Sequence, residues 1–359
     1  MVYDARFMNM ALMLARRGLG NVYPNPAVGC VITRNGVIVG RGWTLEGGRP
    51  HAEVVALNNA GNRAEGATVY VTLEPCCHDG VTGPCTSALI DAKVGEVVIA
   101  VQDPDPRVSG KGIAILQEAG IMKVRYGILR HQAAELNMGF FYSKVLGRPL
   151  ITAKLATTLD GKIATNGGHD MWITNDLTRR WVHKLRAMYD AILVGSNTVV
   201  SDDPMLDCRL PGLEKYSPVR VVVDRLGKLR PTHRLASTAK VIPTYVITDR
   251  DTCSIADGVK YIKVEGGPEF LLNAVQSLTI KLGITRLLVE GGGILITEML
   301  KQGLVDKFIW SRANKIYGSE AAGAIMDLSS SGKKCKFTRT KSLSFGADVV
   351  DIFDIEYEQ

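Results

Sequence analysis

The sequence has few aromatic residues and no dense block of positive charge. Aromatic residues make up only 6% of the 359 residues, and the formal net charge of +7 is spread along the chain without a Lys- or Arg-rich run. A groove that tracks single-stranded nucleic acid combines basic residues with aromatic stacking platforms. The composition therefore argues against a nucleic-acid partner, whereas a mild positive excess suits a phosphorylated small molecule.

Long hydrophobic runs are also absent. No apolar stretch approaches the roughly 18 residues that a membrane-spanning helix needs. The N-terminal residues 1–18 carry Asp4 and Arg6 among apolar positions at helical spacing, which predicts an amphipathic first helix and no signal sequence or membrane anchor. With 46% hydrophobic and 22% charged residues, the chain has the composition of an ordinary globular protein of about two domains.

Cysteine is present, but not in the pattern of a disulfide framework. The chain has seven cysteines, an odd number scattered over its whole length. This usage predicts a reducing, cytoplasmic setting, with Cys76 and Cys85 on a metal ion and the other cysteines buried as small apolar side chains.

Two short stretches carry the strongest chemical signal. Residues 50–57 read PHAEVVAL, and residues 70–85 read YVTLEPCCHDGVTGPC. His51, Cys76 and Cys85 can supply three ligands to a tetrahedral zinc ion and leave the fourth place to water, as in catalytic zinc sites. Glu53 is then free to move protons between that water and a substrate nitrogen, which is the signature of zinc deaminases.

The spacing of the cysteines departs from the usual Cys-x-x-Cys pattern. Eight residues separate Cys76 from Cys85, so Cys77 and His78 are rival ligands. We favour Cys85 because it repeats the Pro-Cys context of Cys76 and begins an expected helix, where a thiolate is stabilised.

The first half of the chain is expected to form a helix, a β-hairpin around Asn35-Gly36 and then alternating helices and strands. This order predicts a mixed sheet with helices on both faces. Lys111 follows a Gly-rich turn at the start of a helix expected over residues 110–119. An anion site and an ordinary helix cap are both compatible with that turn.

The second half is again α/β and follows a linker expected at residues 139–149. A Gly-rich turn at residues 290–293 joins a strand to a helix and can bring backbone N–H groups close to a phosphate, although a simple tight turn fits as well. Residues 202–209 (DDPMLDCR) follow a buried strand and line either a polar pocket or a surface turn. Trp172 is interpreted as a core aromatic in preference to a stacking platform, and residues 307–357 are expected to form mostly antiparallel strands.

Together these motifs resemble the bifunctional deaminase–reductases of bacterial riboflavin biosynthesis, along nearly the whole chain. The first half is matched by residues 24–31 (PNPAVGCV), 50–57, 70–76 and 103–106 (DPDP). The second half is matched by residues 154–161 (KLATTLDG), 172–174 (WIT), 202–209, 289–293 (VEGGG) and 316–318 (IYG).

The resemblance implies two α/β domains with different activities. Residues 1–145 would form a cytidine-deaminase-like three-layer α/β/α domain with a mixed sheet, and residues 146–359 a dihydrofolate-reductase-like domain. The first would use zinc to deaminate 2,5-diamino-6-(5-phosphoribosylamino)pyrimidin-4-one by hydrolysis. The second would use NADPH to reduce the ribosyl group of 5-amino-6-(5-phosphoribosylamino)uracil to ribityl.

The resemblance also implies the site residues. Zinc would be held by His51, Cys76 and Cys85, with Glu53 as the catalytic proton carrier. The remaining carried-over positions are, for the substrate of the deaminase, Asn25, His78 and Lys111; for NADPH, Ala156, Trp172, Thr198, Asp202, Gly292 and Gly293; and for the substrate of the reductase, Lys154, Asp170, Arg186, Leu206, Arg209 and Glu290. Arg225, just after a strand expected at residues 219–223, is a further candidate for the 2′-phosphate of NADP.

The chain departs from the family pattern at two places. The family's cysteine loop usually carries a basic residue and two prolines, whereas this loop has Val81, Gly83 and a single Pro84. Asp170 stands where a smaller polar residue is common. The loop leaves open how the first domain binds a substrate phosphate, and whether both halves are active.

Two other classes of protein share part of the signal. A nucleic-acid-editing zinc deaminase with an accessory domain would have the same zinc ligands, and a non-catalytic protein with a structural zinc would need a fourth ligand such as Cys77. The composition and Glu53 favour the bifunctional enzyme over both. Unpaired strand edges in the second domain make a homo-oligomer, a dimer or a tetramer, the expected assembly.

Overall fold

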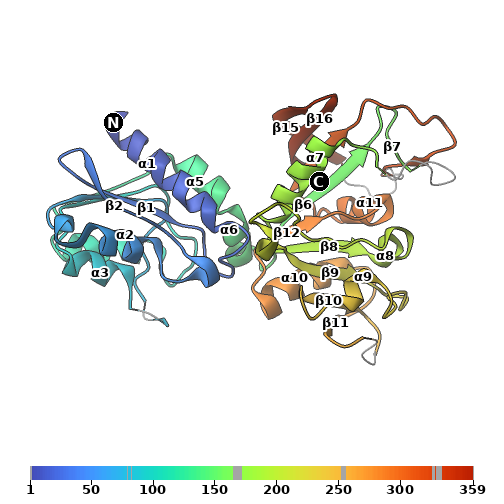
Figure 1. Ribbon diagram of the computed structural model, residues 1–359. Coiled ribbons are helices and arrows are strands. Elements are labelled where there is room, and N and C mark those ends of the chain that lie inside the picture. The colour runs from blue at the N-terminus through green and yellow to red at the C-terminus, as the bar shows by residue number, and fades with distance from the viewer. Residues whose placement is uncertain are drawn as a thin grey trace. The chain divides into compact units, whose positions relative to one another are not determined.

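The protein consists of two compact units, Met1–Gly147 and Arg148–Gln359 (Figure 1). The computed structural model describes residues 2–78, 80–81, 83–164, 172–251, 256–325, 328 and 334–358. Each unit has its own main sheet, and no helix among the described residues is long and apolar enough to span a membrane.

The first unit contains a five-stranded mixed sheet in the order β2-β1-β3-β4-β5. Its strands are β1 (Gly29–Arg34), β2 (Val37–Trp43), β3 (Thr68–Val71), β4 (Glu96–Ile99) and β5 (Lys123–Tyr126). Strand β1 pairs antiparallel with β2 and β3, whereas β3, β4 and β5 are parallel. Asn35 and Gly36 both have positive φ, as the expected two-residue hairpin turn requires.

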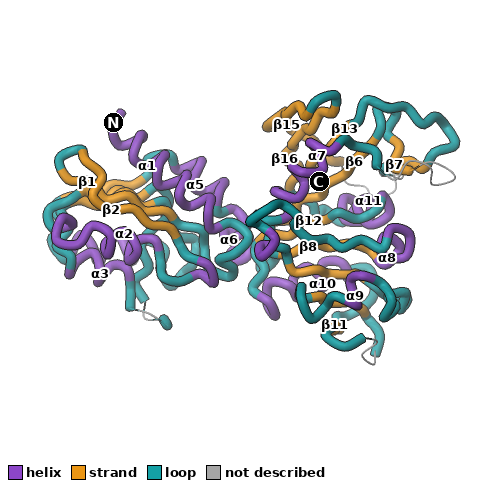
Figure 2. The backbone as a smooth tube through the Cα atoms, viewed as in Figure 1, coloured by secondary structure: helices purple, strands orange, loops and turns teal. Residues whose placement is uncertain are grey.

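Helices cover both faces of this sheet. They are α1 (Val2–Ala15), α2 (Ala52–Ala60), α3 (Cys85–Asp91), α4 (Lys111–Glu118), α5 (Arg130–Leu136) and α6 (Met138–Val145). Figures 1 and 2 show α1 and α5 on one side of the strands and α2 and α3 on the other. The predicted three-layer α/β/α architecture is confirmed.

The linker predicted at residues 139–149 is wrong for most of its length. Residues up to Val145 belong to helix α6, and Leu136 and Phe140 are buried in the core of the first unit. Gly147 and Pro149, which suggested the break, lie beyond the end of α6, and Gly139 within the helix is buried. A glycine can stand inside a helix because a neighbouring element packs against it. In the sequence alone, such a glycine looks the same as one in a loop.

Two glycines in β2 allow α2 to lie directly on the strand. A Cβ added at Gly40 would approach the carbonyl oxygen of Ala56 to 2.3 Å, and one added at Gly42 would approach that of Ala52 to 2.3 Å. These distances are far below van der Waals contact, so only glycine is compatible with this packing. The close approach fixes the start of α2, where His51 and Glu53 lie.

The second unit is built on a nine-stranded sheet in the order β11-β10-β9-β8-β12-β6-β13-β16-β15. These strands are β6 (Leu150–Thr157), β8 (Ala191–Gly195), β9 (Val219–Val223), β10 (Thr244–Thr248), β11 (Val259–Lys263), β12 (Arg286–Val289), β13 (Lys307–Arg312), β15 (Lys334–Phe345) and β16 (Asp348–Glu358). The first seven strands of this order, from β11 at the edge through β13, are all parallel to one another. A short pair, β7 (Lys162–Ala164) and β14 (Ala322–Gly323), forms separately.

The mostly antiparallel strands predicted at the end of the chain are confirmed. Strands β15 and β16 form a long antiparallel hairpin, and β16 pairs antiparallel with β13. Strand β13, however, runs parallel to β6. The α/β class of both units is as predicted.

The connections in the second unit create a switch in direction beside β8. The helices are α7 (Asp176–Arg186), α8 (Ser196–Asp202), α9 (Arg234–Ser237), α10 (Phe270–Leu282) and α11 (Gly293–Lys301). Strand β8 lies between β9 and β12 in the sheet. From β8 the chain continues to β9 on one side, and from β12 it continues to β13 on the opposite side. Ligands of open parallel sheets bind at such a point, beyond the carboxyl ends of the strands.

The cysteines of the described residues are free thiols, in line with the predicted absence of a disulfide framework. Cys30 and Cys208 are buried as expected, but Cys77 and Cys335 are only partly buried. The prediction that every cysteine outside the metal site is buried is therefore wrong.

Candidate active sites

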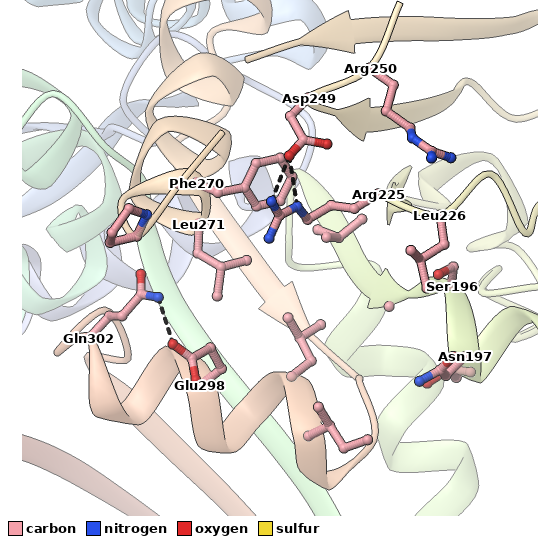
Figure 3. Close-up of a pocket in the computed structure, with 17 residues that line it drawn as sticks. Ser196, Asn197, Arg225, Leu226, Asp249, Arg250, Phe270, Leu271, Glu298 and Gln302 are labelled. Atoms are coloured by element: carbon pink, nitrogen blue, oxygen red, sulfur yellow. Dashed lines mark hydrogen bonds and ion pairs between the residues drawn. The ribbon is translucent and has the colours of Figure 1, made fainter. Parts of the chain in front are cut away.

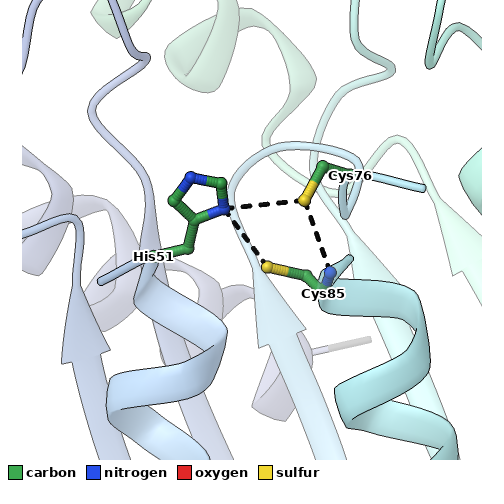
Figure 4. Close-up of side chains that lie close together, drawn as sticks. All are labelled: His51, Cys76 and Cys85. Carbon is green, nitrogen blue, oxygen red and sulfur yellow. Dashed lines mark hydrogen bonds between the residues drawn. The ribbon is translucent and has the colours of Figure 1, made fainter. Parts of the chain in front are cut away.

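The first candidate site gathers one imidazole and two thiols (Figure 4). Nδ1 of His51 lies 3.3 Å from Sγ of Cys85 and 3.6 Å from Sγ of Cys76. The three candidate ligand atoms all lie within 4.8 Å of one another. Around a tetrahedral zinc ion, N and S ligand atoms are separated by about 3.6 Å. The donor set and its spacing therefore fit zinc.

Backbone geometry brings these three side chains together. His51 is the N-cap of α2, and Cys85 is the first residue of α3. Cys76 lies in the loop after β3, and its sulfur accepts a hydrogen bond from the backbone N–H of Cys85 at 3.3 Å. The expected helix start at Cys85 is confirmed, and this amide stabilises a thiolate at Cys76.

The two rival ligands lie differently. The thiol of Cys77 donates to the carbonyl oxygen of Arg107 at 3.7 Å and is not part of the cluster. Nδ1 of His78 is buried and, among the described atoms, has no hydrogen-bond partner. A buried ring nitrogen without a partner is suited to contact a bound molecule.

Burial and hydrogen bonding shift the acidities at this site. Hydrogen bonds from Cys85 and His51 lower the pKa of the Cys76 thiol to about 4, against the effect of burial. The hydrogen bond to Cys76, together with burial, raises the pKa of Cys85. Burial, followed by the nearby charge of Cys76, raises the pKa of Glu53 to about 7. A carboxyl group with such a pKa can both accept and donate a proton near neutral pH.

Glu74 organises the loops around this cluster. The carboxylate of Glu74 is buried and accepts backbone N–H groups from Asp103 at 3.2 Å, Gly110 at 3.0 Å and Ile113 at 3.2 Å. It caps α4 and ties residues 103–113 to the strand that leads to Cys76. Glu74 was not predicted to have a role, although it lies within the motif at residues 70–85.

The carried-over substrate positions lie on segments next to the cluster. The side chain of Asn25 packs over Gly48, where an added Cβ would lie 2.0 Å from Nδ2 of Asn25. Nζ of Lys111 donates to the carbonyl oxygen of Pro106 at 3.0 Å. Because Glu74 already occupies two backbone N–H groups at the start of α4, this turn serves as a helix cap. Val81 is 84% exposed, so the cysteine loop presents an apolar side chain to solvent.

The second candidate site is a pocket of about 710 Å³ at the carboxyl ends of the parallel strands (Figure 3). Its walls are the residues that follow β8, β9, β10 and β11 and the first turn of α11. The lining residues include Asn197, Thr198, Arg225, Asp249, Arg250 and Phe270. It lies at the switch point beside β8, and its volume suits a nucleotide.

Arg225 lines this pocket, but its charge is already partnered. Its Nε and Nη2 donate to Oδ2 of Asp249 at 2.9 and 2.6 Å, and its guanidinium lies 4.8 Å from the ring centre of Phe270. Arg250 also lines the pocket. Figure 3 shows its guanidinium directed away from the Arg225–Asp249 pair. Asp249 and Arg250, the two residues that follow β10, were not predicted as site residues.

Of the other carried-over cofactor positions, the pocket brings only some together. Thr198 lines it, and Oγ1 of Thr198 accepts the backbone N–H of Gly292 at 3.2 Å. Gly293 begins α11 where an added Cβ would lie 2.3 Å from the carbonyl oxygen of Ala324. Ala156, Trp172, Asp202, Gly292 and Gly293 are not among the lining residues. Trp172 is 51% exposed, so its interpretation as a core aromatic is wrong.

Three carried-over substrate residues of the second half form a buried charge cluster. Arg186 donates to both carboxylate oxygens of Glu290, at 2.7 and 3.0 Å, and Nζ of Lys154 lies 3.8 Å from Oε2. Burial would raise the pKa of Glu290, but the charges of Arg186 and Lys154 lower it to about 2. Two cations sharing one anion leave a net positive charge, which favours a negatively charged ligand. Asp170 lies outside the described residues.

Leu206 and Arg209 belong to a segment that buried donors hold in place. Leu206 is buried with a positive φ of 53°, and Nη1 of Arg186 donates to the carbonyl oxygen of Asp207 at 3.0 Å. The side chain of Arg209 pairs with Asp207 at 3.3 Å and is otherwise largely exposed. The predicted polar segment therefore adjoins the charge cluster through Arg186.

Arg220 anchors the same segment and escaped the sequence analysis. It is fully buried in β9 and donates to the carbonyl oxygens of Met205, Leu235 and Ile242 and to two threonine hydroxyl groups. Burial lowers the pKa of Arg220 to about 10, so it stays charged at neutral pH. An arginine within a run of valines gives no sequence signal for such contacts, because its partners lie on other elements.

The fold and the two sites define an enzyme that combines a zinc-type deaminase unit with a reductase unit. Two family sequence models match the chain: the "Cytidine and deoxycytidylate deaminase zinc-binding region" over residues 1–101 and the "RibD C-terminal domain" over residues 149–350. The riboflavin biosynthesis protein RibD of Aquifex aeolicus is 40% identical over 354 residues, 98% of each chain. The Escherichia coli RibD is 40% identical over 332 residues, 89% of this chain and 90% of that protein.

Solved structures agree with these relatives. The RibD structure from Acinetobacter baumannii has a TM-score of 0.90 at 36% identity and covers 99% of each chain. A diaminohydroxyphosphoribosylaminopyrimidine deaminase/5-amino-6-(5-phosphoribosylamino)uracil reductase from Thermotoga maritima has a TM-score of 0.88 at 33% identity and covers 98% of each chain. The chain therefore belongs to the RibD family of bifunctional deaminase–reductases in riboflavin biosynthesis.

Proposed function

We propose that the chain deaminates 2,5-diamino-6-(5-phosphoribosylamino)pyrimidin-4-one and then reduces the ribosyl group of the resulting 5-amino-6-(5-phosphoribosylamino)uracil. The observation that carries the proposal is the zinc-compatible cluster of His51, Cys76 and Cys85 next to the buried Glu53, in a chain that also has a nucleotide-sized pocket. The Thermotoga maritima relative is named for the same two activities.

In the first unit, His51, Cys76 and Cys85 would hold one zinc ion. When bound, zinc supplies an activated water molecule for attack on the amino-bearing ring carbon. Glu53 would carry the proton of that water to the ring nitrogen and then to the departing amine. Its burial in the first turn of α2 supports this role, because α2 is fixed against β2 by the two glycines.

The substrate would lie between the cluster and the segments of Asn25, His78 and Lys111. The unpartnered buried nitrogen of His78 supports a direct contact with it. Lys111 is exposed and donates to a backbone carbonyl group, so it is free to turn towards a phosphate. Lys111 would thereby compensate for the missing basic residue in the loop that carries Val81 and Gly83.

In the second unit, the pocket beside β8 would bind NADPH, which supplies the hydride. Thr198, Gly292, Gly293 and Arg225 would lie along the cofactor, as would Ala156, Trp172 and Asp202 towards its nicotinamide end. The pocket's position at the switch point supports this assignment. Arg225 would bind the 2′-phosphate of NADP and exchange part of its contact with Asp249 for that phosphate.

The substrate of the reductase would lie over the buried charge cluster. Lys154 and Arg186 share Glu290, and their net positive charge supports binding of the ribose phosphate or its hydroxyl groups. Leu206, Arg209 and Asp170 would complete this side of the site.

We further propose that residues 1–145 form the deaminase domain and residues 146–359 the reductase domain, in a cytoplasmic homo-oligomer. The ends of α6 at Val145 and the start of β6 at Leu150 support the boundary. Strand β15 is an edge strand of the nine-stranded sheet and is largely exposed, which supports pairing with a second copy as a dimer or tetramer.

A coupled assay on purified, zinc-checked protein tests the proposal. We expect ammonia release from the diaminopyrimidinone ribotide without NADPH, and NADPH oxidation only after the deaminated product has formed. NADPH oxidation on supplied product without any ammonia release would contradict the deaminase and leave the reductase. Absence of both signals would contradict the whole proposal and restore the nucleic-acid deaminase as the alternative.

A further inference from the structure

Helices α5 and α6 lie beyond the zinc-binding region matched at residues 1–101, yet they contact two of the segments that border it. They pack in the core of the first unit through Ala133, Leu136 and Phe140. Figure 1 shows α5 beside α1. Their polar contacts with the loops of the candidate deaminase site are made by Asn137 and Lys144.

Asn137 joins the two helices and holds the backbone of Ala27. Oδ1 of Asn137 accepts the backbone N–H of Ala27 at 2.9 Å, and Nδ2 donates to the carbonyl oxygen of Ala27 at 3.0 Å. Both residues are buried, each about 3% exposed. Without the amide side chain, a buried N–H and a buried C=O would lose their partners.

Ala27 lies two residues after Asn25, in the segment that leads into β1. The next two backbone N–H groups, of Val28 and Gly29, donate to the hydroxyl groups of Thr44 and Thr72, each at 3.0 Å. Three successive amides are thus held by side chains from three separate segments. Of these three side chains, Asn137 holds the amide that is nearest in sequence to Asn25. The side chain of Asn25 packs over Gly48, three residues before His51.

Lys144 of α6 contacts the second loop. Its Nζ lies 3.2 Å from Oδ2 of Asp105, and the same carboxylate is held by the side chain of Arg107 at 2.7 and 3.0 Å. Asp105 also donates its backbone N–H to Asp103 at 2.8 Å. This loop provides the Pro106 carbonyl group that binds Lys111.

We propose that α5 and α6 are part of the deaminase site, with Asn137 and Lys144 as positioning residues for the Asn25 segment and for the loop at residues 103–107. The inference rests on the proposed deamination and goes beyond it, because it makes substrate binding dependent on helices outside the zinc-binding region. Neither residue touches the reacting atoms. Their substitution should therefore change the KM of the deaminase more than its kcat.

The test compares Asn137→Ala and Asn137→Asp with Leu136→Ala in the full chain. Asn137→Asp keeps the side-chain shape and the acceptor for Ala27 N–H but loses the donor, so it tests the hydrogen bond without a cavity. Leu136→Ala removes neighbouring core packing and leaves Asn137 in place. We expect Asn137→Asp, which loses one buried hydrogen bond, to raise the KM for the ribotide about five- to tenfold, and Asn137→Ala, which loses both, to raise it at least as much.

Other readouts separate positioning from loss of fold. Zinc content and NADPH oxidation on supplied product should stay at the level of the unaltered chain. Hydrogen exchange at the Ala27 amide should become faster in Asn137→Ala, which loses the acceptor for that N–H. Leu136→Ala should lower the melting temperature without raising KM. Lys144→Gln should raise KM about two- to threefold, less than the Asn137 variants because Arg107 still binds Asp105, and Lys144→Arg should restore it.

Three results would overturn the inference. One is an unchanged KM in both Asn137 variants, and another is an equal rise in KM in Leu136→Ala at the same loss of melting temperature. The third is absence of ammonia release by the unaltered chain, which would refute the proposed deamination itself. The assay of the unaltered chain distinguishes this result from the other two, in which that chain is active.

Discussion

In the proposed mechanism, Glu53 is the residue on which the deaminase chemistry depends most directly. We expect Glu53→Gln to lower the kcat of ammonia release by about 10²- to 10⁴-fold, the usual contribution of a general acid–base group. Zinc content and reductase activity should not change, because the amide keeps the shape of the side chain and the metal retains its three ligands. Steady-state kinetics and metal analysis of the same preparation measure both effects.

The control for this substitution is Glu65→Gln, which removes one carboxylate from an exposed position of the same unit. It should leave ammonia release unaffected. Loss of zinc in Glu53→Gln would instead mean that Glu53 is a ligand, and the assignment of its role would then be wrong.

Glu290 makes the second unit sensitive to acid. Its pKa is lowered in the folded chain from 4.5 to about 2, because Arg186 and Lys154 outweigh the effect of burial. A lowered carboxyl pKa contributes stability that is fully present above the unfolded value and is lost as the pH falls through the folded value. The free energy of unfolding should therefore decrease between pH 4.5 and about 2, by an amount on the order of 3 kcal/mol from this group.

Urea unfolding of the second unit as a function of pH measures this decrease. Glu290→Gln should be less stable at neutral pH, because two buried cations lose their anion, and its unfolding free energy should depend less on pH below 4.5. An unchanged pH dependence in the variant would show that other carboxylates account for the acid sensitivity.

At the scale of elements, the contact between α2 and β2 positions His51, one of the three candidate zinc ligands. A Cβ at position 42 would lie 2.3 Å from the carbonyl oxygen of Ala52 and 2.7 Å from the backbone nitrogen of Ala56, so Gly42→Ala must push α2 off the strand. We expect the free energy of unfolding to fall by about 1–3 kcal/mol. Zinc affinity and ammonia release should fall as well, because His51 is the N-cap residue of α2 and moves with that helix.

Gly83→Ala is the matched control, since nothing lies within 4 Å of a Cβ added there. Thermal unfolding and zinc titration of both variants test the prediction. Zinc affinity in Gly42→Ala equal to that of the unaltered chain would mean that the position of α2 does not set the geometry of the ligands.

Elements with a strong local pattern were predictable from the sequence. The boundaries of β9 agree with the strand expected at residues 219–223, and the hairpin turn at Asn35-Gly36 joins β1 to β2 as expected, because apolar runs there lie between clear turn signals. Helix α6 was missed because Gly147 and Pro149, just beyond its end, resemble a break and the linker was extended back to Gly139. The short helices α8 and α9 carry too few residues for a periodic signal.

The candidate sites were predictable where the chemistry is local. The His-x-Glu motif at His51 and the Pro-Cys contexts of Cys76 and Cys85 pointed to the cluster that the structure brings together. The partners of Arg225 and Arg220 were not predictable, because Asp249 and Met205 come near them only through the pairing and connections of the sheet. Long-range contacts of this kind depend on the topology, which the local pattern leaves open.

For the whole molecule, the two units predict that the two activities can be separated by removing the metal. Each unit has its own sheet and hydrophobic core, and the only group of His, Cys, Asp or Glu side chains in the described part of the chain with metal-binding geometry lies in the first unit. A zinc chelator should therefore abolish ammonia release and leave NADPH oxidation on supplied deaminated product intact.

Added zinc should restore ammonia release, because chelation leaves the chain covalently unchanged. If chelation also stopped NADPH oxidation while the second unit remained folded by circular dichroism, the reductase would need a metal of its own, and the assignment of its chemistry to NADPH and the Glu290 cluster alone would be wrong.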